Sequence, residues 1–307
     1  MPGLLNEVHR LIEQRRLRFV LCGSSARKLR RSGVNLLAGR AKTLTMFPLV
    51  SAEVDFIIEP SNVLHYGTLP MAYRSREPVE YLSACAETYL REEVRFEALT
   101  RNIGAFSRFL EVASLHNGSI TNLSNMAREA QVARQTVSSY FEILVDTLVG
   151  YWLPAWKLKR ATKQIAAPKF YFFDSGVARA VSGRLPYPPS REELGPLFET
   201  YILHEVRAFL AYSGKHYPLF FWGTHHGAEV DILTETRSGY VAIELKSGVR
   251  WDKRYNRGLM RLSEVIGQEN VRCYGVYLGD RRLTSGTVTV LPCPRFLEML
   301  WSGDLID

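Results

Sequence analysis

Long hydrophobic runs, an apolar leader and closely spaced cysteines are all missing from this sequence of 307 residues. No uninterrupted apolar stretch approaches the roughly 18–20 residues that a membrane helix needs. The N-terminal stretch MPGLLNEVHRLIEQRR lacks the apolar core of a secretory signal. The four cysteines share no spacing typical of a zinc site or a disulfide framework. We therefore expect a cytoplasmic protein with no membrane partner.

Several catalytic signatures are missing as well. The sequence has no G-x-S-x-G, no dinucleotide fingerprint and no cysteine–histidine pair at a useful spacing, so acyl transfer, redox chemistry and proton abstraction find no support. The composition, 46% hydrophobic and 23% charged, is that of a folded protein. At roughly 100–200 residues per domain, the length predicts two or three domains.

The net charge of +8 is unevenly distributed. Residues 1–40 contain nine basic residues against two acidic ones, and residues 151–173 contain five basic residues and no acidic one. These segments are either solvated basic faces or contacts to the phosphates of a polyanion. Charge alone favours solvated faces.

The N-terminal quarter shows alternating helix and strand patterns. Apolar spacing predicts a helix over 4–15, and a short apolar run predicts a buried strand over 18–23. A basic helix is expected over 25–37, and a strand followed by an ambiguous element over 42–58. The prolines and glycine of 60–76 favour a loop or linker.

The middle of the chain has the pattern of a winged helix. Helical periodicity runs through 78–117, followed by predicted helices at 122–130 and 134–149 around a tight turn near Val132. A β-hairpin is expected within 151–173. A helix-turn-helix followed by a basic hairpin is typical of winged helices that bind DNA.

If this module binds DNA, its second helix would offer Arg134 and Gln135 to the groove. The hairpin would offer Lys157, Lys159 and Arg160 to phosphates. Two acidic residues further along the same helix would repel a DNA backbone, so the module could equally serve only to connect its neighbours.

The final third alternates strands and helices, which indicates α/β organisation around a mixed sheet. Its expected elements are a helix at 192–211, strands at 217–222, 228–234 and 240–246, a helix at about 253–267 and a strand at 271–278.

Acidic residues gather on these elements. Glu244 and Lys246 share one face of their strand because successive side chains alternate. The turn around Gly239 would bring Asp231 beside Glu244, and Glu199 on the preceding helix could reach the same edge of the sheet.

Carboxylates placed this close together repel one another. At about 4 Å and an effective dielectric near 20, each like-charge pair costs roughly 4 kcal/mol. Mg²⁺ held by Asp231 and Glu244 would offset this repulsion and activate a phosphodiester, with Lys246 at the nucleophile and Glu199 assisting. The plain alternative is a surface hairpin with a Glu–Lys ion pair worth about 0–1 kcal/mol.

Phe198-Glu199, Glu229-Val-Asp231 and Ile243-Glu-Leu-Lys-Ser247 resemble the motifs of the PD-(D/E)xK restriction-endonuclease-like superfamily. The stretch RFVLCGSSARKLRRSGVNLLAGRA and the later KFYFFDSG are similar to segments of prokaryotic AAA+ ATP-binding proteins that carry such a domain at their C-terminus. The resemblance implies an α/β multi-domain protein. Its parts would be a partial AAA+ ATPase-like segment (1–77), a helical lid with a winged helix-turn-helix (78–165) and a nuclease-like domain (166–307).

The sequence departs from this family at its start, because neither the P-loop nor the following Asp-Glu strand is present. By resemblance, Ser24 or Ser25 would occupy a polar sensor position and Arg40 would be a trans-acting arginine of a vestigial nucleotide site. We therefore expect an N-terminally truncated chain that uses ATP only when the missing segment is supplied. A homo-oligomer or an association with a P-loop-bearing subunit is expected.

Two functions follow from these patterns. The first is a Mg²⁺-dependent nuclease that binds nucleic acid. The second is a non-catalytic regulatory or DNA-binding scaffold derived from an ATP-binding protein.

Overall fold

The computed structural model describes residues 2–22, 42–89, 102–157 and 164–307. Several predictions lie outside these residues, namely the basic helix at 25–37, the roles of Ser24, Ser25 and Arg40, and the phosphate contacts of Lys159 and Arg160.

The predicted N-terminal helix is confirmed as α1 (Pro2–Arg15). The strands predicted at 18–23 and within 42–58 are wrong for the residues described there. Residues 18–22 and 42–50 belong to no strand, and η1 (Ser51–Val54) is a short 3₁₀ helix. An apolar run becomes a strand only when a partner strand satisfies its backbone groups, and none of the described strands pairs with these segments.

The loop predicted over 60–76 is also wrong, because two helices lie there. α3 (Pro60–Tyr66) and α4 (Pro70–Arg74) each begin at a proline, as does the next helix, α5 (Pro78–Ala84). Proline is favoured in the first turn of a helix, where its missing N–H has no partner to lose. These prolines therefore start helices rather than interrupt them.

The helix-turn-helix pattern in the middle of the chain is confirmed, with slightly shorter helices than expected. The pair α8 (Leu123–Glu129) and α9 (Arg134–Asp146) follows η2 (Cys85–Tyr89) and α7 (Ile103–Leu115). The expected hairpin strands are β1 (Gly150–Leu153) and β2 (Lys169–Phe172), which pair antiparallel with Trp152 opposite Phe170. The predicted boundary between residues 165 and 166 falls between these two paired strands.

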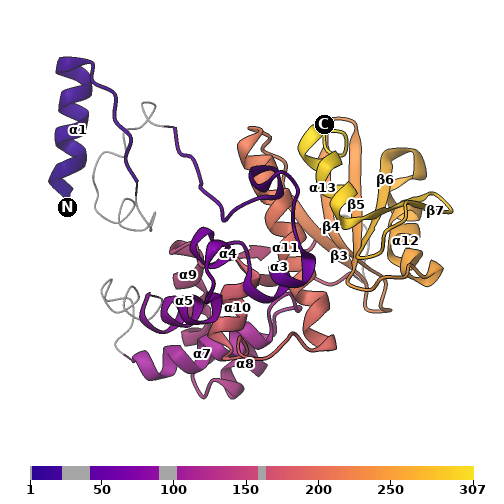
Figure 1. The fold of residues 1–307 in the computed structure, drawn as a ribbon, viewed down its shortest axis with the longest axis horizontal. Helices are drawn as coiled ribbons and strands as arrows, with labels where there is room; N and C mark the ends of the chain where they lie inside the picture. The colour runs from indigo at the N-terminus through magenta and orange to yellow at the C-terminus, as the bar shows by residue number, and fades with distance from the viewer. Residues whose placement is uncertain (1, 23–41, 90–101, 158–163) are drawn as a thin grey trace.

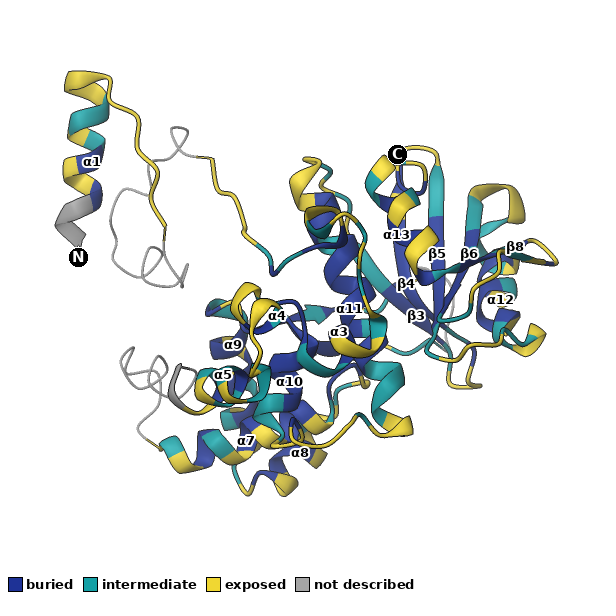
Figure 2. Ribbon diagram, viewed as in Figure 1, coloured by how far each residue is buried: buried dark blue, intermediate teal, exposed yellow. Residues whose placement is uncertain are grey.

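Strand β2 is buried on both faces, and each face serves a different core. Phe170 and Phe172 pack into the core of the helical unit, together with α7, α9 and α10 (Ser175–Val181). Tyr171 points the other way and joins the core of the following α/β unit. The alternation of side chains along a strand thus makes β2 the wall between the two units. Helix α10, in the first of these units, is largely buried (Figure 2).

The α/β unit contains a six-stranded mixed sheet in the order β3-β4-β5-β6-β8-β7 (Figure 1). β3 to β5 are antiparallel, β5, β6 and β8 are parallel, and β7 runs antiparallel to β8. The strands are β3 (Leu219–Gly223), β4 (Glu229–Thr236), β5 (Gly239–Lys246), β6 (Val271–Tyr277), β7 (Leu283–Ser285) and β8 (Val288–Pro292).

Helices cover both faces of this sheet, so the unit has three layers. α11 (Arg191–Tyr212) and α13 (Cys293–Ser302) pack with Ile243 and Leu245 on one face. α12 (Arg257–Ile266), which follows η3 (Lys253–Asn256) and precedes η4 (Gln268–Asn270), packs with Ala242 on the other face. The strands and helices predicted for this part are confirmed. Within the described ranges, no helix has the length and apolar character needed to cross a membrane.

Helix α12 approaches β4 so closely that only glycine fits at Gly258. A Cβ there would lie 1.6 Å from the carbonyl oxygen of Glu229. We expect Gly258→Ala to lower the free energy of unfolding by about 2–4 kcal/mol, since the helix must move away from the strand. The matched control is Gly195→Ala in α11, where a Cβ meets nothing within 4 Å and should stabilise by about 0.5–1 kcal/mol. Urea unfolding of both variants tests this, and equal stabilities would contradict it.

Candidate functional site

The predicted neighbourhood of Asp231 and Glu244 is present at one end of the sheet. β4 and β5 pair with Ile232 opposite Ile243, so Asp231 comes beside Glu244. The backbone N–H of Leu245 donates to Oδ2 of Asp231 at 2.7 Å, which fixes this carboxylate against β5. Both acidic side chains are buried, at 5% and 6% exposure.

Glu244 and Lys246 share a face, as the strand alternation predicted. Nζ of Lys246 donates to Oε1 of Glu244 at 2.6 Å and to the carbonyl oxygen of Leu245 at 3.0 Å, whereas the Leu245 side chain packs in the core. Oε2 of Glu244 is buried and has no hydrogen-bond partner within the described part of the chain. The carboxylate therefore keeps one oxygen available for a further ligand.

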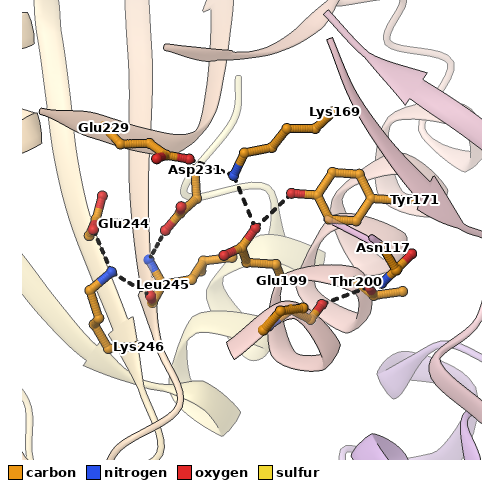
Figure 3. A network of polar contacts seen from close by, with 11 residues as sticks. Asn117, Lys169, Tyr171, Glu199, Thr200, Glu229, Asp231, Glu244, Leu245 and Lys246 are labelled. Atoms are coloured by element: carbon orange, nitrogen blue, oxygen red, sulfur yellow. Dashed lines mark hydrogen bonds and ion pairs between the residues drawn. The ribbon is translucent and has the colours of Figure 1, made fainter. Parts of the chain in front are cut away.

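Glu199 enters the same site from α11 but is held by strand β2 (Figure 3). Its Oε2 accepts from the hydroxyl of Tyr171 at 2.6 Å and lies 3.3 Å from Nζ of Lys169. The same Nζ lies 2.6 Å from Oε1 of Glu229. All four predicted catalytic residues thus lie in one region, where Lys169 connects the helix to the start of β4.

Burial and crowding shift the pKa of the two central acids. Burial is the main cause that raises the pKa of Asp231 from 3.8 to about 7, and the charge of Glu199 adds to it. Burial and the charge of Asp231 likewise raise the pKa of Glu244 well above its usual range, although Lys246 acts against them. The site is therefore short of positive charge.

The lysines respond in the opposite sense. Burial acts to lower the pKa of Lys169, but the surrounding carboxylates, Glu199 foremost, raise it well above its ordinary value. Burial also acts to lower the pKa of Lys246, but the charges of Asp231 and Glu244 outweigh it and raise this pKa. Both ammonium groups stay charged at neutral pH and offset part of the negative charge of the acids.

These residues satisfy the chemical requirements of a magnesium site with two protein carboxylates. Mg²⁺ prefers one or two carboxylates, with water and phosphate oxygens filling the other positions. Asp231 and Glu244 provide two carboxylates, and the unpartnered Oε2 of Glu244 is free to coordinate a metal ion. No set of three or more His, Cys, Asp or Glu side chains in the described ranges is arranged to hold a metal ion, so Glu199 does not complete a third position.

The expectation that Lys169 belongs to a solvated basic face or a phosphate contact is wrong. Its side chain is only 5% exposed and is paired with two carboxylates, because it occupies the inward face of β2. Lys157, Arg134 and Gln135 are exposed, as a contact to nucleic acid requires.

Two further residues of the candidate site, Lys169 and Tyr171, were not predicted from the sequence. The signal was the pattern Lys-Phe-Tyr-Phe, in which a charged and a phenolic side chain share one face of a strand whose other face is aromatic. A second contact fixes this strand, since Nδ2 of Asn117 donates to Oγ1 of Thr200 at 2.9 Å and its Oδ1 accepts from the Phe172 N–H (Figure 3). Asn117 thereby holds β2 against α11.

Comparisons with known proteins match two separate regions of the chain, which meet near the start of α11. Residues 61–187 match a domain of unknown function (DUF8612), and residues 194–296 match another (DUF4143), which is found in proteins associated with AAA ATPases. The candidate site therefore draws Lys169 and Tyr171 from the first region, and the acidic residues and Lys246 from the second.

Two uncharacterized proteins are similar along most of the chain, Rv2008c of Mycobacterium tuberculosis and Mb2031c of Mycobacterium bovis. Each is 25% identical over 287 residues, which is 91% of this chain and 63% of the relative. The chain thus spans less than two thirds of the length of these relatives. No solved structure matches.

The raised pKa of Asp231 predicts a pH-dependent cost to stability. The folded state keeps a proton that the unfolded chain loses near pH 3.8, so the stability of the wild type falls as pH rises from about 4 to 7. Asp231→Asn removes this cost while its amide oxygen still accepts from Leu245. In chelator at pH 8, we expect the variant to be more stable than the wild type by about 1–3 kcal/mol, an advantage that disappears near pH 4.

Denaturant unfolding at both pH values measures the difference. Asp280→Asn, at an exposed position, is the control and should behave like the wild type. An Asp231→Asn variant that is less stable at pH 8 than at pH 4, relative to the wild type, would contradict the assignment.

Proposed function

We propose that this chain is a metal-dependent nuclease that hydrolyses phosphodiesters of nucleic acid. The observation that carries the proposal is the convergence of Asp231, Glu244 and Lys246 at one sheet end, with one buried carboxylate oxygen of Glu244 left unpartnered. An ordinary surface ion pair would not need two buried acids whose pKa values are raised by burial first and by neighbouring carboxylates second.

In this proposal Asp231 and Glu244 hold Mg²⁺, which when bound polarises a phosphodiester and lowers the pKa of a coordinated water. Lys246 orients the attacking water or stabilises the negative charge that develops on the phosphate. Glu199, fixed by Lys169 and Tyr171, assists from the side of α11. The buried site excludes bulk water, which strengthens each of these electrostatic interactions.

The finer fold assignments belong to the same proposal. A helix with Glu199, then strands with Asp231 and the Glu-x-Lys pair, supports a PD-(D/E)xK nuclease-like domain. The helix pair and hairpin before it support a winged helix that contacts nucleic acid through Arg134 and Lys157. The match to a domain found with AAA ATPases supports an origin in that class of protein.

A second candidate is a non-catalytic scaffold that regulates a partner or binds DNA. The pairing of Lys169 with Glu199 and Glu229 favours it, because a network of this kind also serves to join two structural units. Metal-dependent cleavage separates the two candidates.

We expect the wild type to nick plasmid DNA in Mg²⁺ or Mn²⁺, and Lys246→Ala to lower the rate at least about 100-fold. The amine contacts the reacting region through Glu244, so its loss removes charge stabilisation in the transition state. Agarose-gel rates in Mg²⁺, Mn²⁺ and chelator measure the effect.

Arg237→Ala is the control, because this exposed residue lies in the turn between β4 and β5 at the opposite end of the sheet. It should cleave like the wild type. Absence of cleavage with either metal, with and without ATP, would leave the scaffold as the function of the chain.

A further inference from the structure

Three loops surround the end of the sheet at which the carboxylates lie. β3 ends at Gly223 and β4 starts at Glu229, so residues 224–228 connect them there. β5 ends at Lys246 and the parallel β6 ends at Tyr277, which places residues 247–257 and 278–282 at the same end. We name these three segments the basic rim.

The segments of the basic rim hold one another in place. The N–H of Leu278 donates to the carbonyl oxygen of Gly248 at 3.1 Å, and Nη2 of Arg257 donates to that of His226 at 3.2 Å. Nζ of Lys246 lies 5.5 Å from the ring centroid of Tyr255. Residues 247–257, the central segment of the rim, therefore directly border the candidate site.

The central segment is held in place by hydrogen bonds and packing of Trp251 and Asn256. Nε1 of Trp251 donates to Oδ1 of Asn256 at 3.0 Å, and Nδ2 of Asn256 donates to the carbonyl and hydroxyl oxygens of Ser285, both at 2.9 Å. Trp251 also packs against Gly275, where a Cβ would come within 2.4 Å of its ring. A loop fixed in this way loses little entropy when its outward side chains bind a ligand.

The outward side chains are predominantly basic. The rim has six exposed Lys or Arg residues against two acidic ones, and these six are Arg250, Lys253, Arg254, Arg257, Arg281 and Arg282. Arg254 pairs with Asp252 at 2.8 Å, and Nε of Arg281 lies 4.0 Å from Asp280. Arg250, Lys253 and Arg282 have no ionic partner among the residues that the structure describes.

We propose that the basic rim binds the sugar–phosphate backbone of the nucleic acid on which the site acts. The inference rests on the proposed function, since the rim would present a phosphodiester to Asp231, Glu244 and Lys246. A polyanion approaching buried carboxylates is repelled, and positive charge beside the site offsets this repulsion. The position of the rim, rather than its charge alone, separates it from the basic residues elsewhere on the chain.

The test removes the three unpaired charges together, in R250A/K253A/R282A. Binding of a fluorescent duplex DNA is measured by anisotropy in chelator, where no metal-dependent cleavage occurs, between about 50 and 200 mM salt. Each lost phosphate contact reduces the magnitude of the negative slope of log K against log salt by about 0.9. We therefore expect the magnitude of the slope to fall by about 2–3 and the affinity to weaken about tenfold or more.

The control, K215A/R237A/R272A, removes three positive charges at the opposite end of the sheet and should leave slope and affinity unchanged. Of these, Lys215 donates to the carbonyl oxygen of Ile306 and Arg272 pairs with Asp307. A second comparison, R134A/K157A, tests the helix-turn-helix and hairpin. Thermal unfolding by circular dichroism confirms that each variant is folded. Rim and control variants that bind DNA equally, or binding lost only in R134A/K157A, would overturn the proposal, as would a wild type that binds no DNA.

The outcome is separable from that of the cleavage experiment. If the rim variant loses binding but the wild type cuts nothing in Mg²⁺ or Mn²⁺, the proposed hydrolysis fails and the nucleic-acid surface stands. If the rim variant loses binding, and Lys246→Ala binds DNA like the wild type but does not cut it, both proposals are supported.

Discussion

The ammonium group of Lys169 lies between the carboxylates of Glu199 and Glu229, and the arrangement of the two units depends on this contact. Glu199 comes from a helix, Glu229 from the start of β4, and Lys169 from a strand that belongs to the helical unit. The Lys169 side chain is 5% exposed, against 19% for Glu199 and 38% for Glu229, so removing both carboxylates would leave a buried positive charge without compensation. The contact therefore fixes the edge of the site as well as the interface between the units.

The charge that Lys169 supplies is not enough for the whole site. Four carboxylates lie near two ammonium groups. Burial, and after it this excess of negative charge, raises the pKa of the two most buried acids, Asp231 and Glu244. Such a site costs stability, and folded proteins accept this cost mainly where a function requires it. A bound cation relieves the cost, so stability and the proposed chemistry are linked through the same oxygens.

Local rules predicted the α/β unit and the acidic core of the site. Strand alternation placed Glu244 and Lys246 on one face, and the turn at Gly239 set the register that brings Asp231 beside them. The role of Lys169 could not be predicted in this way, because burial of its side chain results from packing of β2 between two cores. In a run of basic residues, one buried lysine looks like its solvated neighbours until the partner elements are known.

The errors in the N-terminal part have a related cause. The prolines of 60–76 predict a break in helical structure, but Pro60 and Pro70 each occupy the first turn of a helix, where proline is favoured. The strand expected near residue 20 required a partner, and strand formation is a non-local event that no sequence window contains.

The positive charge of this chain now falls into classes with different physical consequences. Lys169 is buried and Lys246 is half-buried, and both neutralise acids, so removing them changes folding and the site rather than long-range attraction. The six basic side chains of the rim are exposed, and salt screens their attraction for a polyanion over about 8–10 Å. Net charge alone conceals this division. The sequence becomes informative about function only when each charge is assigned to the inside or the outside of the sheet end that holds Asp231 and Glu244.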